Sequence, residues 1–197
     1  MPAGTLPLGN GKAIIFSAPS GAGKTTLVRN LMKCSSLNLG FSVSATTREK
    51  RIDEIDGEAY HFISSEEFRS LIQGGKFVEW EEVYDGVFYG TLCSEVEKLW
   101  AQGMTPVFDI DVEGGKTLKS VFGESALAIF VMTPSIEELE RRLRLRQTED
   151  EGSIQKRIDK AAEEISKASF FDVRVENDVL QTAINETERL VTKFLAP

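Results

Sequence analysis

The chain contains the stretch Ala13-Ile14-Ile15-Phe16-Ser17-Ala18-Pro19-Ser20-Gly21-Ala22-Gly23-Lys24-Thr25-Thr26, an apolar run that leads through a glycine-rich turn into an amphipathic segment. A strand, a loop and a helix in this order form the nucleotide phosphate-binding loop, in which backbone N–H groups surround phosphate oxygens. The residues expected around the phosphates of a nucleoside triphosphate are Ala18, Pro19, Ser20, Gly21, Ala22, Gly23, Lys24, Thr25 and Thr26. Within this loop we expect Lys24 to reach the transferred phosphate and Thr25 to reach a magnesium ion.

One position departs from the usual loop pattern, because Ala18 stands where the first glycine normally lies. Alanine is tolerated there if residue 18 keeps a negative φ. The alternative is a turn that binds nothing, and the presence of Gly21, Gly23, Lys24 and Thr25 together argues against it. The loop alone does not separate kinases, GTPases and mechanical ATPases.

Short β-branched and aromatic runs alternate with longer amphipathic segments, a pattern typical of an α/β protein with a central, mostly parallel sheet flanked by helices. The strands expected in this sheet cover residues 13–16, 41–44, 106–110, 127–132 and 173–175. The helices expected around it cover residues 24–33, 94–101, 136–146, 153–168 and 180–194.

The pattern changes between residues 59 and 91, where short strands around 60–62, 77–80 and 87–89 accompany a helix over 66–73. We interpret this region as a small mixed β subdomain inserted into the core. The expected parts of a single domain over 12–197 are the core (12–40, 92–134 and 169–197), the subdomain (about 41–91) and a helical lid (about 135–168), preceded by a flexible tail (1–11).

Composition and charge exclude several classes of protein. With 41% hydrophobic and 27% charged residues the chain is an ordinary globular protein, and its net charge of −8 argues against nucleic-acid or membrane binding, which requires a basic surface. Cys34 and Cys93 show no metal-type or redox-type spacing, so we expect two reduced thiols. The sequence shows neither a secretory signal nor the roughly 20 apolar residues of a membrane-spanning helix, so we expect a cytoplasmic protein.

The segment Phe41-Ser42-Val43-Ser44-Ala45-Thr46-Thr47-Arg48-Glu49-Lys50-Arg51, followed by Gly57 and Tyr60, resembles the GMP-binding region of the guanylate kinase family. The resemblance extends from Ile14 to about Leu180 and includes Phe77-Val78-Glu79-Trp80, Tyr89-Gly90-Thr91 and Asp109-Ile110-Asp111. It implies an α/β phosphate-loop kinase that transfers a phosphoryl group from ATP to GMP with Mg²⁺. The implied partners are ATP and GMP or dGMP, and the oligomeric state is not specified.

In the family, the residues that match Arg48, Arg51, Tyr60 and Tyr89 bind the GMP phosphate. Guanidinium groups bind phosphate oxygens in pairs, and tyrosine hydroxyls donate further hydrogen bonds. The resemblance also makes Arg48 a catalytic residue. Taken without the neighbouring motifs, the same residues would favour a solvated basic turn beside tyrosines at the edge of a core.

The resemblance assigns the guanine base to Glu79, Ser44, Thr91 and Asp111. The Glu79 carboxylate would accept hydrogen bonds from the Watson–Crick edge of guanine, whereas adenine presents an acceptor at N1 and would be repelled. Buried polar groups that stay unpaired reject the wrong base by roughly 10⁴-fold or more. Asp109, at the end of an apolar strand, is expected to join Thr25 at the magnesium ion or to belong to the network that orients the phosphates. As an alternative, either aspartate would simply cap the next segment.

The resemblance also implies lid arginines that close over ATP and stabilise the phosphoryl group in flight, namely Arg142, Arg146 and Arg157. Gln147 replaces the glycine that usually follows the second of them, which would stiffen the hinge. The alternative for these arginines is a solvated basic face. No general base is required, because the attacking phosphate oxygen is already ionised, so we expect a structural role for His61.

Three other functions compete with this one. A non-catalytic guanylate-kinase-like interaction module would normally have lost the phosphate loop, which is intact here. A kinase for another nucleoside monophosphate is disfavoured by Glu79, Ser44 and Thr91. A GTPase is disfavoured because the chain lacks an Asn-Lys-x-Asp run.

Overall fold

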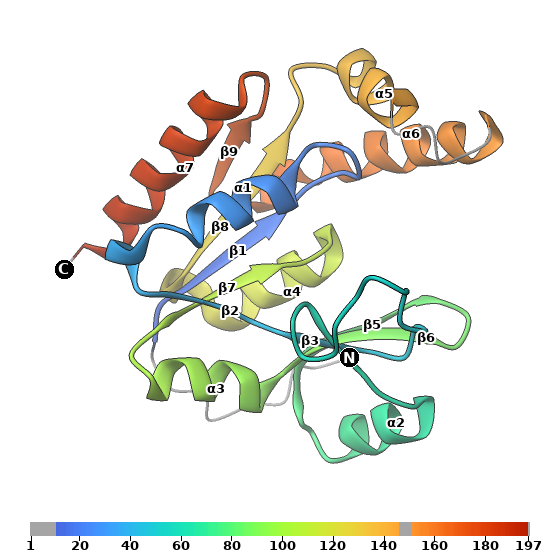
Figure 1. Cartoon of the computed structure of the whole chain (residues 1–197), viewed down its shortest axis with the longest axis vertical. Coiled ribbons are helices and arrows are strands. Elements are labelled where there is room, and N and C mark those ends of the chain that lie inside the picture. The colour runs from blue at the N-terminus through green and yellow to red at the C-terminus, as the bar shows by residue number, and fades with distance from the viewer. Residues whose placement is uncertain (1–10, 146–150, 197) are drawn as a thin grey trace.

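A computed structural model describes residues 11–145 and 151–196 and contains a five-stranded parallel sheet and a four-stranded mixed sheet (Figure 1). The parallel sheet has the order β2-β7-β1-β8-β9. Its strands are β1 (Ala13–Ser17), β2 (Leu39–Phe41), β7 (Thr105–Asp109), β8 (Ala126–Met132) and β9 (Val173–Glu176). The mixed sheet has the order β4-β3-β6-β5, with β3 (Ser44–Thr46), β4 (Tyr60–Phe62), β5 (Phe77–Tyr84) and β6 (Val87–Leu92).

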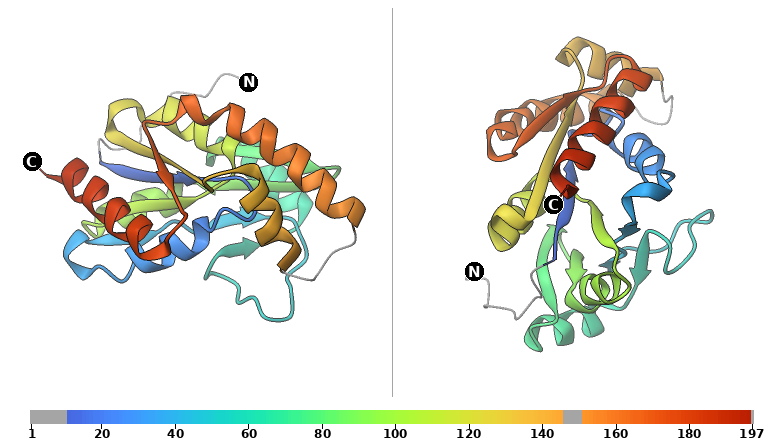
Figure 2. Two further views of the ribbon diagram at one scale, coloured as in Figure 1. Left: turned by 90° about the horizontal axis from the view of Figure 1, so that it is seen from above. Right: turned by 90° about the vertical axis from the view of Figure 1, so that its left-hand side faces the viewer.

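Helices connect these strands and lie on both sides of the parallel sheet (Figure 2). The α-helices are α1 (Lys24–Leu31), α2 (Ser65–Gln73), α3 (Cys93–Ala101), α4 (Val112–Phe122), α5 (Ile136–Leu145), α6 (Glu151–Ser166) and α7 (Leu180–Leu195). Short 3-10 helices cover Ser35–Leu37, Gly123–Ser125 and Ala168–Phe170. Among the described residues, no helix has the length and apolar character that crossing a bilayer requires.

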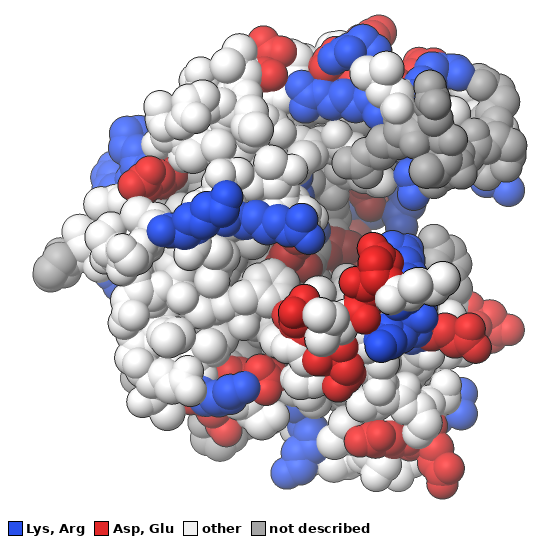
Figure 3. Space-filling view, in the orientation of Figure 1, with Lys and Arg blue, Asp and Glu red and all other residues white. Residues whose placement is uncertain are grey.

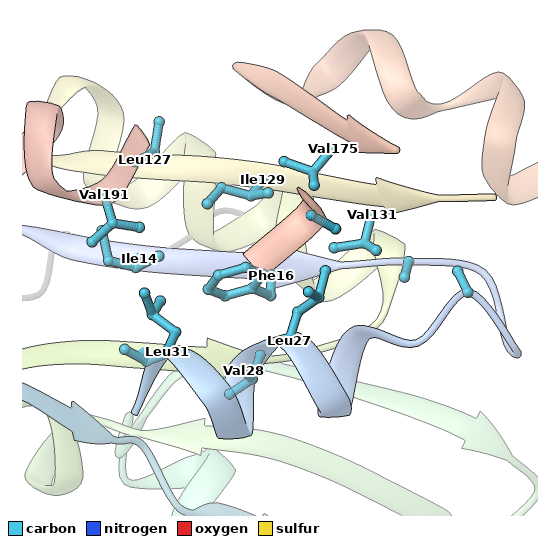
Figure 4. Close-up of a cluster of buried hydrophobic side chains, with 14 residues drawn as sticks. Ile14, Phe16, Leu27, Val28, Leu31, Leu127, Ile129, Val131, Val175 and Val191 are labelled. Carbon is cyan, nitrogen blue, oxygen red and sulfur yellow. The ribbon is translucent and has the colours of Figure 1, made fainter. Parts of the chain in front are cut away.

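Strand β1 lies at the centre of the parallel sheet and is buried along its whole length. Because side chains alternate across a strand, its residues divide between two cores. Ile14 and Phe16 pack with α1 and α7 in the cluster drawn in Figure 4, whereas Ala13 and Ile15 pack with α3 and α4. This division explains why β1 is apolar without interruption, as is usual for a parallel strand covered on both faces.

The mixed sheet has a small core of its own. Phe68 from α2 stacks on Phe77 with ring centroids 4.4 Å apart and on Phe88 with centroids 5.3 Å apart. Helix α2 begins at a sequence-encoded cap, because Ser64 Oγ accepts a hydrogen bond from the Glu67 N–H at 3.1 Å. The aromatic cluster covers one face of this sheet, and polar residues on the other face, including Ser44 and Glu79, line a cavity.

Helices α5 and α6 pack against each other through Leu139, Leu143, Ile158 and Ala161. Helix α5 follows β8 directly in the chain, and its Leu143 approaches the phosphate-binding loop: a Cβ built on Gly21 would lie 3.0 Å from Leu143 Cδ2. Leu143 and Leu139 of α5 therefore lie beside the loop at Gly21.

The α/β class, the parallel sheet flanked by helices and the additional mixed sheet are confirmed. The predicted strand over residues 41–44 is wrong: the chain leaves the parallel sheet after Phe41 and enters the mixed sheet at Ser44, with Ser42 and Val43 between the two strands. Helix α4 was not predicted, because two glycines, Gly114 and Gly115, weaken its helical pattern. Tertiary contact explains them, since a Cβ on Gly115 would lie 2.3 Å from Ser17 Oγ.

We predict that Ile129→Ala in β8 lowers the free energy of unfolding by about 2–5 kcal/mol, because the side chain is fully buried between β1 and the covering helices and leaves a cavity. Denaturant unfolding followed by circular dichroism measures this change. Ile52→Ala is the matched control, because Ile52 is fully exposed and its truncation should change stability by less than about 0.5 kcal/mol. Similar losses for the two variants would contradict the described core.

Candidate functional site

The glycine-rich loop lies between the carboxyl end of β1 and the start of α1. Gly21 and Gly23 have φ values of +95° and +90°, in the region that glycine adopts without strain. Asn38 is the one non-glycine residue with positive φ in the described part of the chain, so Ala18 satisfies the condition for replacing the first glycine. Gly23 caps α1 without a side-chain hydrogen bond, which leaves N–H groups of the first turn available to an anion.

Asn177 supports this loop through a contact that was not predicted from the sequence. Its side chain is buried, and Nδ2 donates to the carbonyl oxygen of Ala22 at 2.8 Å. Its backbone N–H donates to the carbonyl oxygen of Met132 at 2.7 Å, which ties the loop to the end of β8. A Cβ on Gly23 would lie 2.3 Å from Asn177 Nδ2, so both backbone conformation and space require glycine at position 23.

Lys24, Thr25 and Asp109 meet at the carboxyl ends of β1 and β7. Lys24 Nζ lies 2.8 Å from Asp109 Oδ1 and also donates to the carbonyl oxygen of Ile110. Thr25 Oγ1 donates to Asp109 Oδ2 at 3.0 Å. A hydroxyl and a carboxylate oxygen at this separation fit Mg²⁺, which takes few protein ligands and completes its shell with water and phosphate oxygens.

The mixed sheet places three polar residues side by side on neighbouring strands. Ser44 pairs with Thr91 in the β3–β6 ladder, and Glu79 pairs with Thr91 in the β5–β6 ladder. Glu79 is 7% exposed, and its Oε1 accepts a hydrogen bond from Thr91 Oγ1 at 2.7 Å. Burial raises the pKa of Glu79 to about 7, and the Thr91 hydrogen bond opposes this shift. Hydrogen bonding from Thr91 therefore offsets only part of the desolvation penalty on the charged carboxyl group.

Glu81 joins this group and was not among the predicted residues. It lies two positions after Glu79 on β5, and burial together with the nearby Asp111 carboxyl raises its pKa to about 7. Asp111 caps α4, because its Oδ1 accepts from the Gly114 N–H at 2.8 Å. The cap that the sequence left open as an alternative is present, and it also fixes the Asp111 side chain beside Glu81. Alternation along β5 was the signal that placed Glu81 on the same face as Glu79.

Arg48 is held by Glu54, another residue that the sequence analysis did not identify. Its Nη1 and Nη2 donate to the two carboxylate oxygens of Glu54 at 2.8 and 2.7 Å. Arg48 holds the pKa of Glu54 down at about 2, with help from the Arg51 N–H. The Arg48 guanidinium lies 5.4 Å from the centroid of the Tyr60 ring. This ion pair orients the arginine before any anion binds.

The four residues assigned to the GMP phosphate do not form a single contact cluster. The Tyr60 and Tyr89 rings meet edge to face with centroids 5.8 Å apart, and Arg48 lies beside them. The Arg51 side chain is exposed and lines a neighbouring cavity with Glu54 and Tyr60. Three of the four residues are therefore brought together, and Arg51 lines the neighbouring cavity with Tyr60.

Two adjoining cavities, of about 420 and 580 Å³, both reach Thr25, Ser44, Tyr60 and Asp109. The first is also lined by Lys24, Glu79, Glu81, Tyr89, Asp111 and Lys160. Figure 3 shows acidic and basic side chains side by side around the hollow on this face of the molecule. Lys24 and Thr25, at the end of the phosphate-binding loop, thus line the same cavity as Glu79 on the polar face of the mixed sheet.

Of the three predicted lid arginines, Arg146 lies outside the described residues, as does Gln147. Arg142 Nε donates to Glu138 Oε1 at 2.7 Å, and its Nη2 donates to the carbonyl oxygen of Asp178 at 3.4 Å. Arg157 is half-buried on α6. The neighbouring Arg141 and Arg144 form helix-surface ion pairs with Glu138 and Glu140.

Comparison with known proteins agrees with this geometry. The family model for guanylate kinase matches residues 10–194. The guanylate kinase of Porphyromonas gingivalis is 46% identical over 185 residues, covering 94% of this chain and 98% of that protein. The guanylate kinase of Salinibacter ruber is 47% identical over 183 residues, covering 93% of this chain and 96% of that protein.

Among solved structures, the crystal structure of guanylate kinase from Anaplasma phagocytophilum superposes with a TM-score of 0.75 at 29% sequence identity. The match covers 94% of this chain and 87% of that one. Sequence and structure therefore agree along nearly the whole length, and the chain belongs to the guanylate kinase family.

Proposed function

We propose that the chain is a guanylate kinase, which transfers the terminal phosphoryl group of ATP to GMP and yields ADP and GDP. The observation that carries this proposal is one cavity lined both by the phosphate-binding Lys24 and Thr25 and by the guanine-type acceptor Glu79. A donor site and an acceptor site that open into the same space allow direct, in-line transfer between two nucleotides.

The base is recognised by hydrogen bonds of opposite polarity. Guanine offers N–H donors at N1 and N2, and the buried Glu79 offers carboxylate oxygens, one of which already accepts from Thr91. Adenine offers an acceptor at N1, which would face the carboxylate without a hydrogen. Ser44 and Thr91 supply hydroxyl groups for the remaining polar atoms of guanine, and Asp111 lies near the base.

The GMP phosphate is bound by Arg48, Arg51, Tyr60 and Tyr89 in this proposal. Glu54 holds the guanidinium of Arg48 in place, so less conformational entropy is lost when the phosphate binds. The attacking oxygen is already ionised, and no general base is assigned. His61 accordingly lies near Glu95, with Nε2 and Oε1 3.6 Å apart, in a structural position.

On the ATP side, residues 18–26 surround the phosphates and Lys24 neutralises the transferred group. Thr25 and Asp109 would hold Mg²⁺, which supplies positive charge to the phosphates when it is bound. Arg142 and Arg157 would add charge from the α5–α6 lid, and Arg146 is assigned the same role outside the described residues. We assign dGMP as an alternative acceptor and the cytoplasm as the location, where Cys34 and Cys93 remain free thiols.

A coupled assay of ADP formation with ATP, Mg²⁺ and each of four nucleoside monophosphates tests the function. We expect kcat/KM for GMP to exceed the values for AMP, CMP and UMP by on the order of 10⁴, because the wrong base leaves Glu79 unpaired. Preference for another base would identify a different monophosphate kinase. A folded protein that binds ATP but phosphorylates none of them would be an interaction module.

Replacing Lys24 with alanine should lower kcat by about 10²- to 10³-fold or more, because the transferred phosphate loses its main positive charge. Steady-state kinetics with ATP and GMP measure the loss, and thermal unfolding confirms that the variant is folded. Lys33→Ala removes the same charge from an exposed position shortly after α1 and should keep the original kcat. Equal kinetics for the two variants would remove Lys24 from the reaction.

GMP use should increase with pH between about 6 and 8, because the Glu79 carboxyl has a raised pKa of about 7 and must be ionised to accept hydrogen bonds from guanine. The kcat/KM for GMP, measured across this range at saturating ATP, reports the free enzyme. The GMP phosphate also titrates, so Glu79→Gln serves as the control: it keeps the phosphate titration and should lose the part due to the carboxyl. Identical pH profiles would contradict the assignment.

A further inference from the structure

Helix α6 contributes a lysine, Lys160, to the cavity of about 420 Å³ that Glu81 and Asp111 also line. The Lys160 side chain is 59% exposed. Within α6 its Nζ lies 3.9 Å from Glu164 Oε1, farther than the about 2.7–2.9 Å of a close charge-assisted hydrogen bond. The ammonium group is therefore held only weakly by its own helix.

The carboxyl groups of Glu81 and Asp111 form a pair in this cavity. They are in hydrogen-bond contact, and burial together with Asp111 raises the pKa of Glu81 to about 7. The positive charge of Lys160 acts on Glu81 in the opposite direction and lowers its pKa. A cation close to two partly buried carboxyl groups stabilises their charged forms. Lys160 therefore lies within electrostatic range of a pair that favours a cation.

Lys160 lies on the face of α6 that is turned toward the site. Arg157, Lys160 and Glu164 follow one another at three- and four-residue spacing, so they share one face of the helix. Burial raises the pKa of Glu164, Lys160 lowers it, and the charges of Asp111 and Lys24 also act on it. The same helix face thus carries Lys160 toward the carboxyl pair and, less than one turn earlier, the predicted lid residue Arg157.

The C-terminal end of α6 is already tied to the core. Lys167 follows the helix directly, and its Nζ lies 2.9 Å from Glu113 Oε1 on α4. Lys160 lies seven residues earlier, about 10 Å along the helix axis at about 1.5 Å per residue. A helix held at one point can still pivot, whereas a second contact fixes its axis. An ion pair between Lys160 and Glu81 would supply that second contact and would set the position of Arg157.

We propose that Lys160 is a positioning residue for phosphoryl transfer: its ammonium group pairs with Glu81 when the two nucleotides fill the cavity, which fixes α6 and places Arg157 at the transferred phosphate. The inference rests on the proposed function of the chain, in which Arg157 supplies charge from the lid. Lys160 contacts neither nucleotide itself. Its removal therefore lowers kcat and leaves KM nearly unchanged, because the interaction that is lost acts in the transition state.

The first test compares steady-state kinetics with ATP and GMP for wild-type protein and Lys160→Met. Met keeps the apolar stem of lysine without the charge. We expect kcat to fall about tenfold, because Arg157 is misplaced, and KM for each nucleotide to change by less than about twofold. An unchanged kcat, or a loss confined to KM, would overturn the inference.

Three further measurements accompany this test. Lys160→Arg keeps the charge and should retain most of the wild-type kcat. Lys193→Met removes the same charge from an exposed position on α7 and should keep the wild-type kcat. Thermal unfolding of Lys160→Met should match that of the wild type, because the side chain is exposed. Equal losses of kcat in Lys160→Met and Lys193→Met would show that total charge, and not the position of Lys160, controls the rate, which would overturn the inference.

A double-mutant cycle tests the pairing with Glu81. Glu81→Gln removes the charge of the partner, keeps its shape, and should lower kcat as well. The double variant should lose no more activity than Lys160→Met alone, because both changes remove the same interaction. Losses that multiply would overturn the pairing. Wild-type protein that phosphorylates no nucleoside monophosphate would overturn the proposed function together with this inference, whereas GMP turnover combined with multiplied losses would overturn only the role of Lys160.

Discussion

The parallel pairing of β1 with β7 is the contact on which the site depends. The register sets Phe16 beside Asp109, so the strand that ends in the phosphate-binding loop ends level with the strand that ends in the acidic residue. This alignment allows Lys24 and Thr25 to reach both oxygens of Asp109. A shift by one residue would turn Asp109 to the opposite face of the sheet, because side chains alternate along a strand.

A second constraint is the burial of carboxyl groups whose hydrogen bonds do not fully offset the loss of water. Glu79 and Glu81 both have pKa values raised to about 7. The pKa of each carboxyl group is therefore higher in the folded state than its unfolded value of 4.5. Below pH 4.5 both groups make their full contribution to folding stability, and this contribution is lost as the pH rises through about 7. The fold thus holds two carboxyl groups in one cavity where burial disfavours their charged forms. Buried, underpaired polar groups of this kind favour selectivity over stability.

Much of the site could be predicted from local sequence, because its residues lie in short motifs at the ends of strands. Lys24, Thr25 and Asp109 meet as the strand-loop-helix pattern and the apolar strand predicted. Supporting contacts were harder to predict, because they join distant segments. Asn177 braces the loop across a separation of 155 residues, and no local signal shows which side chain would fill that space. The salt bridge between Arg48 and Glu54 was not predicted for a different reason. The two residues are six positions apart, and outside a helix no fixed spacing indicates which side chains will meet.

The sequence by itself determined the α/β class and the phosphate-binding loop, because hydrophobic periodicity and glycine placement act over short distances along the chain. The family followed from the resemblance of short motifs, such as the run from Phe41 to Arg51. Tertiary structure alone decided that the chain changes sheets between Phe41 and Ser44, and that two glycines are accommodated in α4 by close packing. It also decided that Glu81 lines the same cavity as Glu79. Burial and hydrogen-bond satisfaction depend on which segments pack together, and local sequence carries no record of that packing.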